Sequence, residues 1–272
     1  MCPITSSKKG IVYLPCLRSV GALRLFDAHT HLDMNHYKND LDKVVKRARE
    51  AGVEGMVNSS IGPGSFRRTL GIVKRYNGLI FHSAGTLVSQ LTRKEADQIL
   101  TLARRYSSEL VAIGEVGLDY YWIKDPAGRK AQEPLFRDFI QLAEELDLPL
   151  VIHSRKAEAE AVDILEREFG GDVLMHCFDG KPDVARRVAD NGWYITLPAN
   201  FRRYRNRIKA AQVIPLEQIM LETDGPYLSP TGERNEPANI RLGCEALAEL
   251  LEADVETVAD TTTTNAHRFY RM

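Results

Sequence analysis

The stretch FDAHTHLD, residues 26–33, places two histidines two positions apart directly after the short apolar run LRLF of residues 23–26. Alternate residues of a β-strand point to the same face, so His29 and His31 can converge on one point. A half-exposed loop pair is the alternative interpretation, because the pattern is short and common. The loop after this first segment lacks the GxGxxG pattern of dinucleotide-binding folds, and the chain contains no GxxxxGK[ST] pattern.

Short apolar segments alternate with segments of helical periodicity along the whole chain. The apolar segments predict strands at 25–29, 55–58, 79–82, 111–115, 149–153, 173–176, 193–196 and 219–222. Apolar spacing near 3.6 predicts helices at 41–51, 95–106, 132–146, 157–169 and 184–191. Eight buried strands, each followed by a helix or helical loop, favour an α/β fold of the TIM (β/α)8 barrel type over an open doubly wound sheet.

Length and composition predict one large domain. The chain has 272 residues, of which 44% are hydrophobic and 27% are charged, and no linker or low-complexity stretch divides it. We expect a hydrolase domain over residues 25–272, preceded by an N-terminal extension over residues 1–24. No apolar run is long enough to span a bilayer. A net charge of −1 means that any nucleic acid must bind through a local patch or through metal ions.

The cysteines indicate a reducing compartment. None of the four forms a CxxC pair or part of a disulfide framework. They are Cys2, Cys16, Cys177 and Cys244. We therefore expect free thiols in a cytoplasmic protein, and no obligate protein partner is evident.

Polar side chains follow several predicted strands at their carboxyl ends, where the active sites of TIM barrels lie. In chain order they are His29, His31, Glu115, His153, His176 and Asp224. A single histidine after a buried strand is more often a hydrogen-bonded structural residue. Four imidazoles and two carboxylates together would be costly to bury without cations, and this predicts a two-metal hydrolytic centre.

The candidate ligands divide into two sets, one for each ion. We expect His29, His31 and Asp224 to hold one ion, and His153 and His176 to hold the other. Glu115 would bridge the two ions, because a carboxylate has two oxygens to share.

Seven motifs together resemble the TatD family of metal-dependent deoxyribonucleases, in the amidohydrolase superfamily, over roughly residues 25–272. They are FDAHTHLD, AIGEVGLDYY, LPLVIHSRKA, HCFDG, LETDGPYLSP, NEPANI and NAHRFY. The resemblance implies a TIM barrel with the same six ligands and two divalent ions, which would be Mg²⁺, Mn²⁺ or Zn²⁺. It also implies 3′-to-5′ exonuclease activity on DNA by a metal-activated water, with Glu115 and Asp224 as catalytic residues and Asp224 as the proton acceptor.

One departure from the family pattern concerns the substrate. Many members carry Gly-x-His-Pro after the third strand, and that histidine is expected near the substrate phosphate. Here the stretch reads AGTLV, with Leu87 and Val88 at these positions. His82 lies five residues earlier, and we interpret it as structural. A hydrolase of amides, lactones or phosphotriesters therefore remains an alternative, and a non-catalytic partner-binding barrel is a second one.

Arginines near the predicted strand ends are candidates for binding substrate phosphates. Arg155 follows His153 by two residues and could grip a phosphate with two hydrogen bonds, or form a salt bridge at the rim. The run RRYRNR at 202–207, with Arg202 and Arg203, combines basic and aromatic residues as a phosphate backbone would require. A solvated helix surface is the alternative for this run.

The stretch LDYYW at 118–122 adds polar and aromatic candidates. Tyr120 is expected to pack, whereas Trp122 could either stack on a base or close the top of the barrel. Asp119 and Asp27 are candidates for orienting ligand histidines through the second ring nitrogen.

Overall fold

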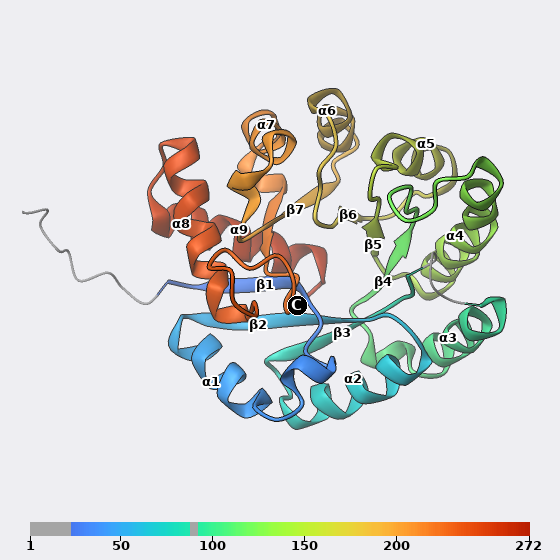
Figure 1. Ribbon diagram of the computed structural model, residues 1–272, viewed down its shortest axis with the longest axis horizontal. Helices are drawn as coiled ribbons and strands as arrows, with labels where there is room; N and C mark the ends of the chain where they lie inside the picture. Colours follow the sequence, from blue (N-terminus) through green and yellow to red (C-terminus); the bar gives the residue numbers. More distant parts are fainter. Residues whose placement is uncertain (1–22, 88–91) are drawn as a thin grey trace, which may run out of the picture.

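Eight parallel strands form one curled sheet, with the strands in sequence order (Figure 1). The computed structural model describes residues 23–87 and 92–272, so most of the predicted extension and Val88 lie outside the described residues. The strands are β1 Leu25–Thr30, β2 Val53–Ser60, β3 Ile80–Ala84, β4 Ala112–Gly117, β5 Leu150–His153, β6 Val173–Met175, β7 Tyr194–Pro198 and β8 Ile219–Glu222. Each lies on a predicted strand, and the predicted α/β barrel is confirmed.

The first and last strands of the barrel meet at their carboxyl ends. The backbone N–H of Asp224 donates to the carbonyl of His29 at 3.0 Å, and that of His31 donates to the carbonyl of Gly225 at 2.8 Å. The buried Asp27 carboxylate accepts from the backbone N–H of Thr223 at 2.9 Å. The junction is therefore held together at the end of the barrel where the candidate ligands lie.

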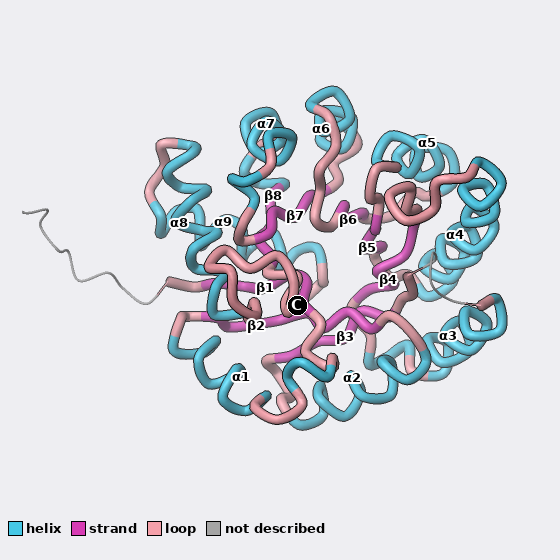
Figure 2. Tube along the Cα trace, in the orientation of Figure 1, coloured by secondary structure: helices cyan, strands magenta, loops and turns pink. Residues whose placement is uncertain are grey.

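Helices surround the barrel on its outside, as the cyan segments of Figure 2 show. They are α1 Leu41–Glu50, α2 Pro63–Arg75, α3 Arg93–Arg105, α4 Pro126–Leu146, α5 Glu158–Glu168, α6 Pro182–Asp190, α7 Arg205–Val213, α8 Ile240–Leu251 and α9 Val255–Phe269. Helix α4 begins six residues before the predicted 132. Its start is fixed by Asp125, whose side chain accepts from the Gly128 N–H at 2.7 Å, and by Pro126 in the first turn.

Apolar side chains and the last helix seal the amino-terminal end of the barrel. Phe269 and Tyr270, at the end of α9, belong to one buried cluster with Phe26 and Ala28 of β1. The Tyr270 hydroxyl donates to the Ala28 carbonyl at 2.8 Å, so the phenol is satisfied where it is buried.

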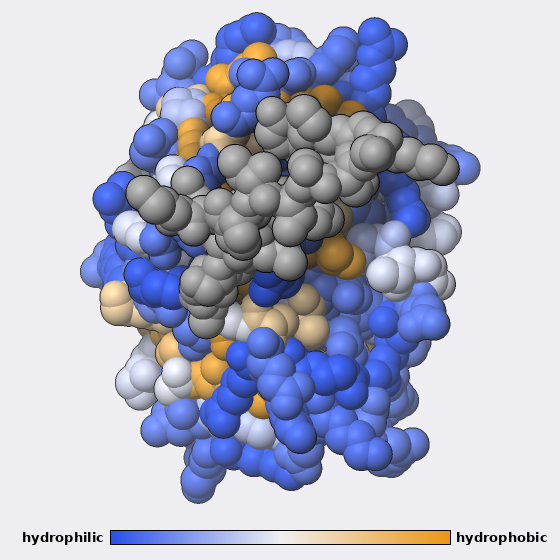
Figure 3. All heavy atoms as spheres, turned by 90° about the vertical axis from the view of Figure 1, so that its left-hand side faces the viewer, coloured by the Kyte–Doolittle hydropathy of each residue, from blue (hydrophilic) through white to orange (hydrophobic). Residues whose placement is uncertain are grey.

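Most of the coloured surface in Figure 3 is hydrophilic, with smaller hydrophobic areas between the polar side chains. Within the described ranges, no helix has both the length and the apolar character needed to cross a membrane.

Candidate metal centre

The six predicted side chains come together at the carboxyl end of the barrel. They are His29 at the end of β1, His31 just after it, Glu115 in β4, His153 at the end of β5, His176 after β6 and Asp224 after β8. Three overlapping groups have ligand atoms close enough together to hold a metal ion. These groups are His29, His31 and Glu115; Glu115, His153 and His176; and His29, His176 and Glu222. Five of the six predicted side chains belong to these groups, and Glu222 is added to them. Asp224 belongs to none of the groups, but its Oδ1 lies 3.3 Å from Nε2 of His31.

Glu115 lies at the centre of this group. Its Oε2 atom is 3.1 Å from Nε2 of His29 and 2.7 Å from Nε2 of His176. Oε2 is buried, and it has no hydrogen bond of acceptable geometry within the described residues. A buried carboxylate oxygen needs a partner, and a cation shared with the two imidazoles would supply one. The donor set thus fits a divalent metal.

The histidine pair of β1 is oriented by the neighbouring strand β2. His29 Nε2 and His31 Nε2 lie 3.3 Å apart, and Asp224 Oδ1 lies 3.3 Å from His31 Nε2. The other ring nitrogens face Ser59, with its hydroxyl 3.1 Å from Nδ1 of His29 and its carbonyl 2.8 Å from Nδ1 of His31. Because Nδ1 of each ring is engaged, both Nε2 atoms are left for the shared site.

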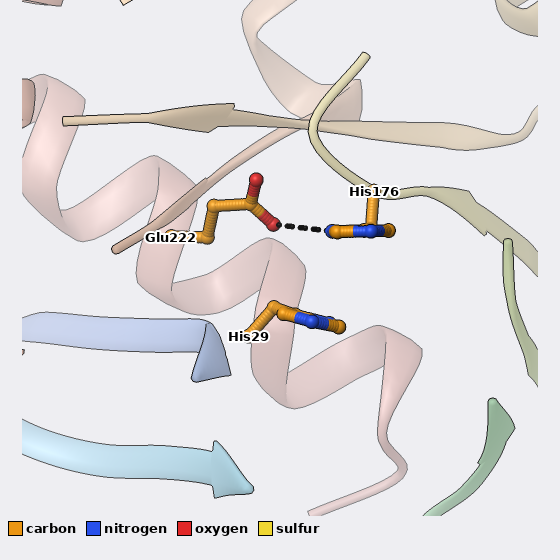
Figure 4. A group of neighbouring side chains, drawn as sticks. All are labelled: His29, His176 and Glu222. Atoms are coloured by element: carbon orange, nitrogen blue, oxygen red, sulfur yellow. Dashed lines mark hydrogen bonds and ion pairs between the residues drawn. The ribbon is translucent and has the colours of Figure 1, made fainter. Parts of the chain in front are cut away.

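Glu222 performs a similar positioning role for His176. Figure 4 shows the rings of His29 and His176 lying face to face, with centroids 4.0 Å apart, and Glu222 pointing toward His176. Glu222 Oε2 lies 3.3 Å from Nδ1 of His176 and accepts a hydrogen bond from the Thr196 hydroxyl at 2.6 Å. Neither Ser59 nor Glu222 belongs to the set of site residues predicted from the sequence. The only available signal for Glu222 was its place at the end of a strand, two residues before Asp224.

The two aspartates expected to orient histidines differ in what they contact. Asp119 Oδ2 lies 3.0 Å from Nε2 of His153, as expected for such a partner. Asp27 instead accepts from the backbone N–H of His29, at 3.3 Å, and from Thr223. Asp27 therefore joins β1 to β8 rather than holding a ligand ring.

Glycines in β4 allow Glu115 and His153 to come together. Gly117 has a φ of +143°, and a Cβ there would overlap the carbonyl of His153. A Cβ at Gly114 would likewise overlap the carbonyl of Val151. The GEVG stretch therefore permits a close approach of β4 to β5 that larger residues would prevent.

Burial and neighbouring charges shift the pKa values of the cluster in opposite directions. Burial lowers the pKa of His29, and the adjacent His176 lowers it further. Burial alone would lower the pKa of His31, but the hydrogen bond to Asp224 and the charge of Glu115 raise it to about 9. Burial opposes ionisation of Glu115, yet the charge of His176 and its contacts hold the Glu115 pKa well below the usual value. The carboxylates thus favour positive charge in the space between them.

The predicted phosphate-binding arginines lie in three different environments. Arg155 stacks on Tyr121, with its Cζ atom 3.8 Å from the ring centroid. Arg202 pairs with Glu249 at 2.6 Å, and Arg203 donates to the carbonyl of Pro230 at 2.7 Å. All three follow strands at the carboxyl end of the barrel, but only Arg155 has a guanidinium without a hydrogen bond or ion pair to the described part of the chain.

Arg207, the last arginine of the basic run, is buried instead. Its Nη2 lies 3.0 Å from Sγ of Cys177, the residue after His176, and its Cζ lies 4.3 Å from the centroid of the Tyr204 ring. The Nε atom has no hydrogen-bond partner among the described residues. A basic run in a sequence does not show which of its members turns inward.

His82 is buried away from the carboxylates. Its Nε2 lies 2.9 Å from the Ser60 hydroxyl, and its ring packs against Phe66 with centroids 4.6 Å apart. Burial lowers the pKa of His82 to about 3. The environment of His82 agrees with the structural role expected for it. Leu87, where the family pattern led us to expect a histidine, is described in the structure, whereas Val88 lies outside the described residues.

Comparison with known proteins identifies the family. The family model described as TatD related DNase matches residues 26–271. The deoxyribonuclease TATDN3 of Homo sapiens is 34% identical over 267 residues, which cover 93% of this chain and 97% of that protein. A protein of Bacillus subtilis, described as the uncharacterized metal-dependent hydrolase YabD, is 34% identical over 255 residues, covering 91% and 99% of the two chains.

Solved structures share the fold. The crystal structure of YjjV, a TatD homolog of Escherichia coli K12, superposes with a TM-score of 0.83 at 23% identity and covers 93% of this chain and all of that one. A family match over nearly the whole chain, together with relatives above 30% identity, shows that this protein belongs to the TatD family of metal-dependent hydrolases.

Proposed function

We propose that this protein is a TatD-type deoxyribonuclease, a divalent-metal-dependent hydrolase that cleaves phosphodiester bonds of DNA in the 3′-to-5′ direction. The observation that carries the proposal is the buried Glu115 Oε2, which lies 3.1 Å and 2.7 Å from the Nε2 atoms of His29 and His176 and has no hydrogen bond of acceptable geometry in the described chain. The naming of relatives such as human TATDN3 as deoxyribonucleases supports DNA as the substrate.

Two divalent ions fit the ligands at hand. His29, His31 and Asp224 would hold one ion, His153 and His176 the other, and Glu115 would be shared. Divalent cations at such sites polarise phosphoryl oxygens and generate a nucleophile from water near neutral pH. Imidazole-rich ligation accepts Zn²⁺ or Mn²⁺ more readily than Mg²⁺, which prefers oxygen ligands.

Asp224 is the acidic residue best placed to accept a proton. Its side chain is 15% exposed, whereas that of Glu115 is 4% exposed, so water reaches Asp224 more easily. Asp224 Oδ1 also lies 3.3 Å from Nε2 of His31, which holds it at the edge of the site. A proton released from the attacking water would be taken up at the Asp224 carboxylate. Substrate phosphates would be held by Arg155, with Arg202 and Arg203 farther along the rim.

The proposal extends to the domain boundaries and to the location of the protein. We assign the hydrolase domain to residues 25–272 and treat residues 1–24 as an extension. Cys177 and Cys244 are free thiols in the structure, and this supports a location in the cytoplasm.

Release of mononucleotides from a 3′-labelled single-stranded oligonucleotide tests the function. We expect release with added Mn²⁺ or Mg²⁺, none with EDTA, and none from the Asp224→Ala variant. Wild-type protein that binds metal but releases no nucleotide would contradict a nuclease, and assays with amides, lactones and phosphotriesters would then be required. Protein that binds no divalent metal would contradict the hydrolase itself and favour a partner-binding barrel.

A further inference from the structure

Large exposed aromatic side chains in the described part of the chain gather at the carboxyl end of the barrel. Tyr121 and Trp122 are 42% and 61% exposed and follow β4, while Tyr204 and Tyr227 follow β7 and β8. Isolated exposed aromatics are common, but adjacent ones at the mouth of a site indicate a binding surface. Tyr121 and Trp122 form the tightest of these groups, with ring centroids 5.0 Å apart and nearly perpendicular planes.

Arg155 completes this group from the neighbouring loop. Its Cζ lies 3.8 Å from the centroid of the Tyr121 ring and 5.9 Å from that of Trp122. The guanidinium is exposed and makes no hydrogen bond or ion pair with residues 23–87 or 92–272, so its N–H groups are available to a ligand. One face of the Arg155 guanidinium thus packs on the Tyr121 ring, while its N–H groups remain available to a ligand.

A single carboxylate ties this group to the candidate metal centre. Asp119 Oδ1 accepts from the backbone N–H groups of Tyr121 and Trp122, each at 2.9 Å, and Oδ2 lies 3.0 Å from Nε2 of His153. The backbone N–H of Tyr120 also donates to the carbonyl of Arg155 at 2.9 Å. The two loops are therefore joined directly beside a proposed metal ligand.

Tyr120, unlike the neighbouring Tyr121 and Trp122, packs against the protein. Its ring packs against the hydrophobic core and lies under Arg129, whose Cζ is 4.6 Å from the ring centroid. Packing thus accounts for Tyr120 but leaves the rings of Tyr121 and Trp122 in water. Of the two roles expected for Trp122, closing the barrel would require this indole to be buried, whereas it is 61% exposed.

We propose that Tyr121, Trp122 and Arg155 form a stacking site for an unpaired nucleobase of the strand whose phosphate enters the metal centre. This inference rests on the proposed nuclease function and adds that a base near the cleaved phosphate must be unpaired. Bases inside a duplex are already stacked on each other, whereas an unpaired base exposes its faces to aromatic rings and to a guanidinium. The site would therefore favour single-stranded or frayed ends and tolerate any base.

Trp122 provides a direct test of binding that does not depend on catalysis. The chain contains two tryptophans, and the other one, Trp193, is buried just before β7. We expect a single-stranded oligothymidylate, added to the full-length protein in EDTA, to quench the fluorescence of the wild type. The same oligonucleotide with abasic sugars throughout should quench little, and the Trp122→Phe variant should show no quenching. Equal quenching by the abasic and normal oligonucleotides would overturn base stacking.

Kinetics on the metal-loaded enzyme test the same site during turnover. Trp122→Ala should raise KM for single-stranded DNA about tenfold, with little change in kcat, and Trp122→Phe should restore most of the loss. Leu242→Ala removes an exposed apolar side chain of α8 and serves as the control. Unchanged KM in Trp122→Ala would overturn the proposal. If neither the wild type nor any variant releases nucleotides, the proposed nuclease function is wrong. The fluorescence measurement would then still test the stacking site.

Discussion

Two regions of the barrel bury histidines in different surroundings. At the carboxyl end, the ring nitrogens of His29, His31 and His176 face the carboxylates of Glu115, Asp224 and Glu222. On β3, His82 faces the Ser60 hydroxyl and the ring of Phe66, and its Nδ1 has no hydrogen-bond partner in the described chain. All four imidazoles are buried.

The two regions differ in whether carboxylates counteract the effect of burial on the histidine pKa. Burial alone lowers the pKa of His82 to about 3, so this ring is neutral in the fold. At the carboxyl end the same burial is offset by carboxylates, and the pKa of His176 is raised well above its usual value. A buried histidine is thus a candidate ligand when carboxylates share its surroundings, and a structural residue when apolar rings do.

Glu115→Ala should have the largest effect on activity. Removal of the shared carboxylate should lower nuclease turnover by several orders of magnitude while leaving the circular dichroism spectrum unchanged. Bound metal, measured on the purified protein by elemental analysis, should fall in parallel. The His82→Gln variant is the control, and it should keep its metal and most of its activity. Wild-type turnover with full metal content in Glu115→Ala would refute the proposed metal centre.

Asp119→Asn should have the next largest effect, because it weakens the contact with His153 without removing a ligand. Loss of such a partner typically lowers metal affinity by about 10- to 100-fold. Titration calorimetry with Zn²⁺ or Mn²⁺ measures this directly. Asp42→Asn, at an exposed carboxylate that pairs with Arg75, should leave the affinity unchanged. Equal affinity in the two variants would show that Asp119 does not support the ligand.

Stability at acid pH should depend on His82. The folded pKa is depressed, so the unfolded chain binds a proton below about pH 6.5 that the folded chain binds only near pH 3. The free energy of unfolding therefore falls as the pH drops through this window.

Urea unfolding of the wild type and of His82→Gln at pH 6 and pH 5 isolates this contribution, because other groups cancel in the difference. We expect the wild type to lose about 1 kcal/mol more than the variant over this pH unit. The same pH dependence in both proteins would mean that His82 binds its proton over the same pH range in the folded and the unfolded chain, and that its pKa is not lowered by burial.

Arg202→Ala should have the smallest effect. Its guanidinium is already paired with Glu249, and exposed ion pairs contribute little to stability. KM for single-stranded DNA should change by no more than about twofold. Arg155→Ala should raise KM more, because it removes a cation that has no ion pair among the described residues. A larger effect of Arg202→Ala would show that the Glu249 pair opens to bind the substrate.

Much of the fold and of the candidate centre could be predicted from local patterns. The eight apolar segments indicated the barrel, and the side chains after five of the strands indicated which residues would meet, because the carboxyl ends of parallel strands share one end of a barrel. The position of Asp125 was a visible signal for the early start of α4, although apolar periodicity placed that start six residues later.

The sequence by itself determined the alternation of strands and helices, the six candidate ligands and the family, since these depend on residue type and spacing along the chain. Only the tertiary structure decided that Ser59 and Glu222 hold the rings and that Asp27 joins β1 to β8. It also decided that Arg202 forms an ion pair while Arg155 forms none with the described residues. These outcomes depend on which residues of distant segments face one another. Such contacts are made only when the barrel closes, and no spacing within one segment encodes them.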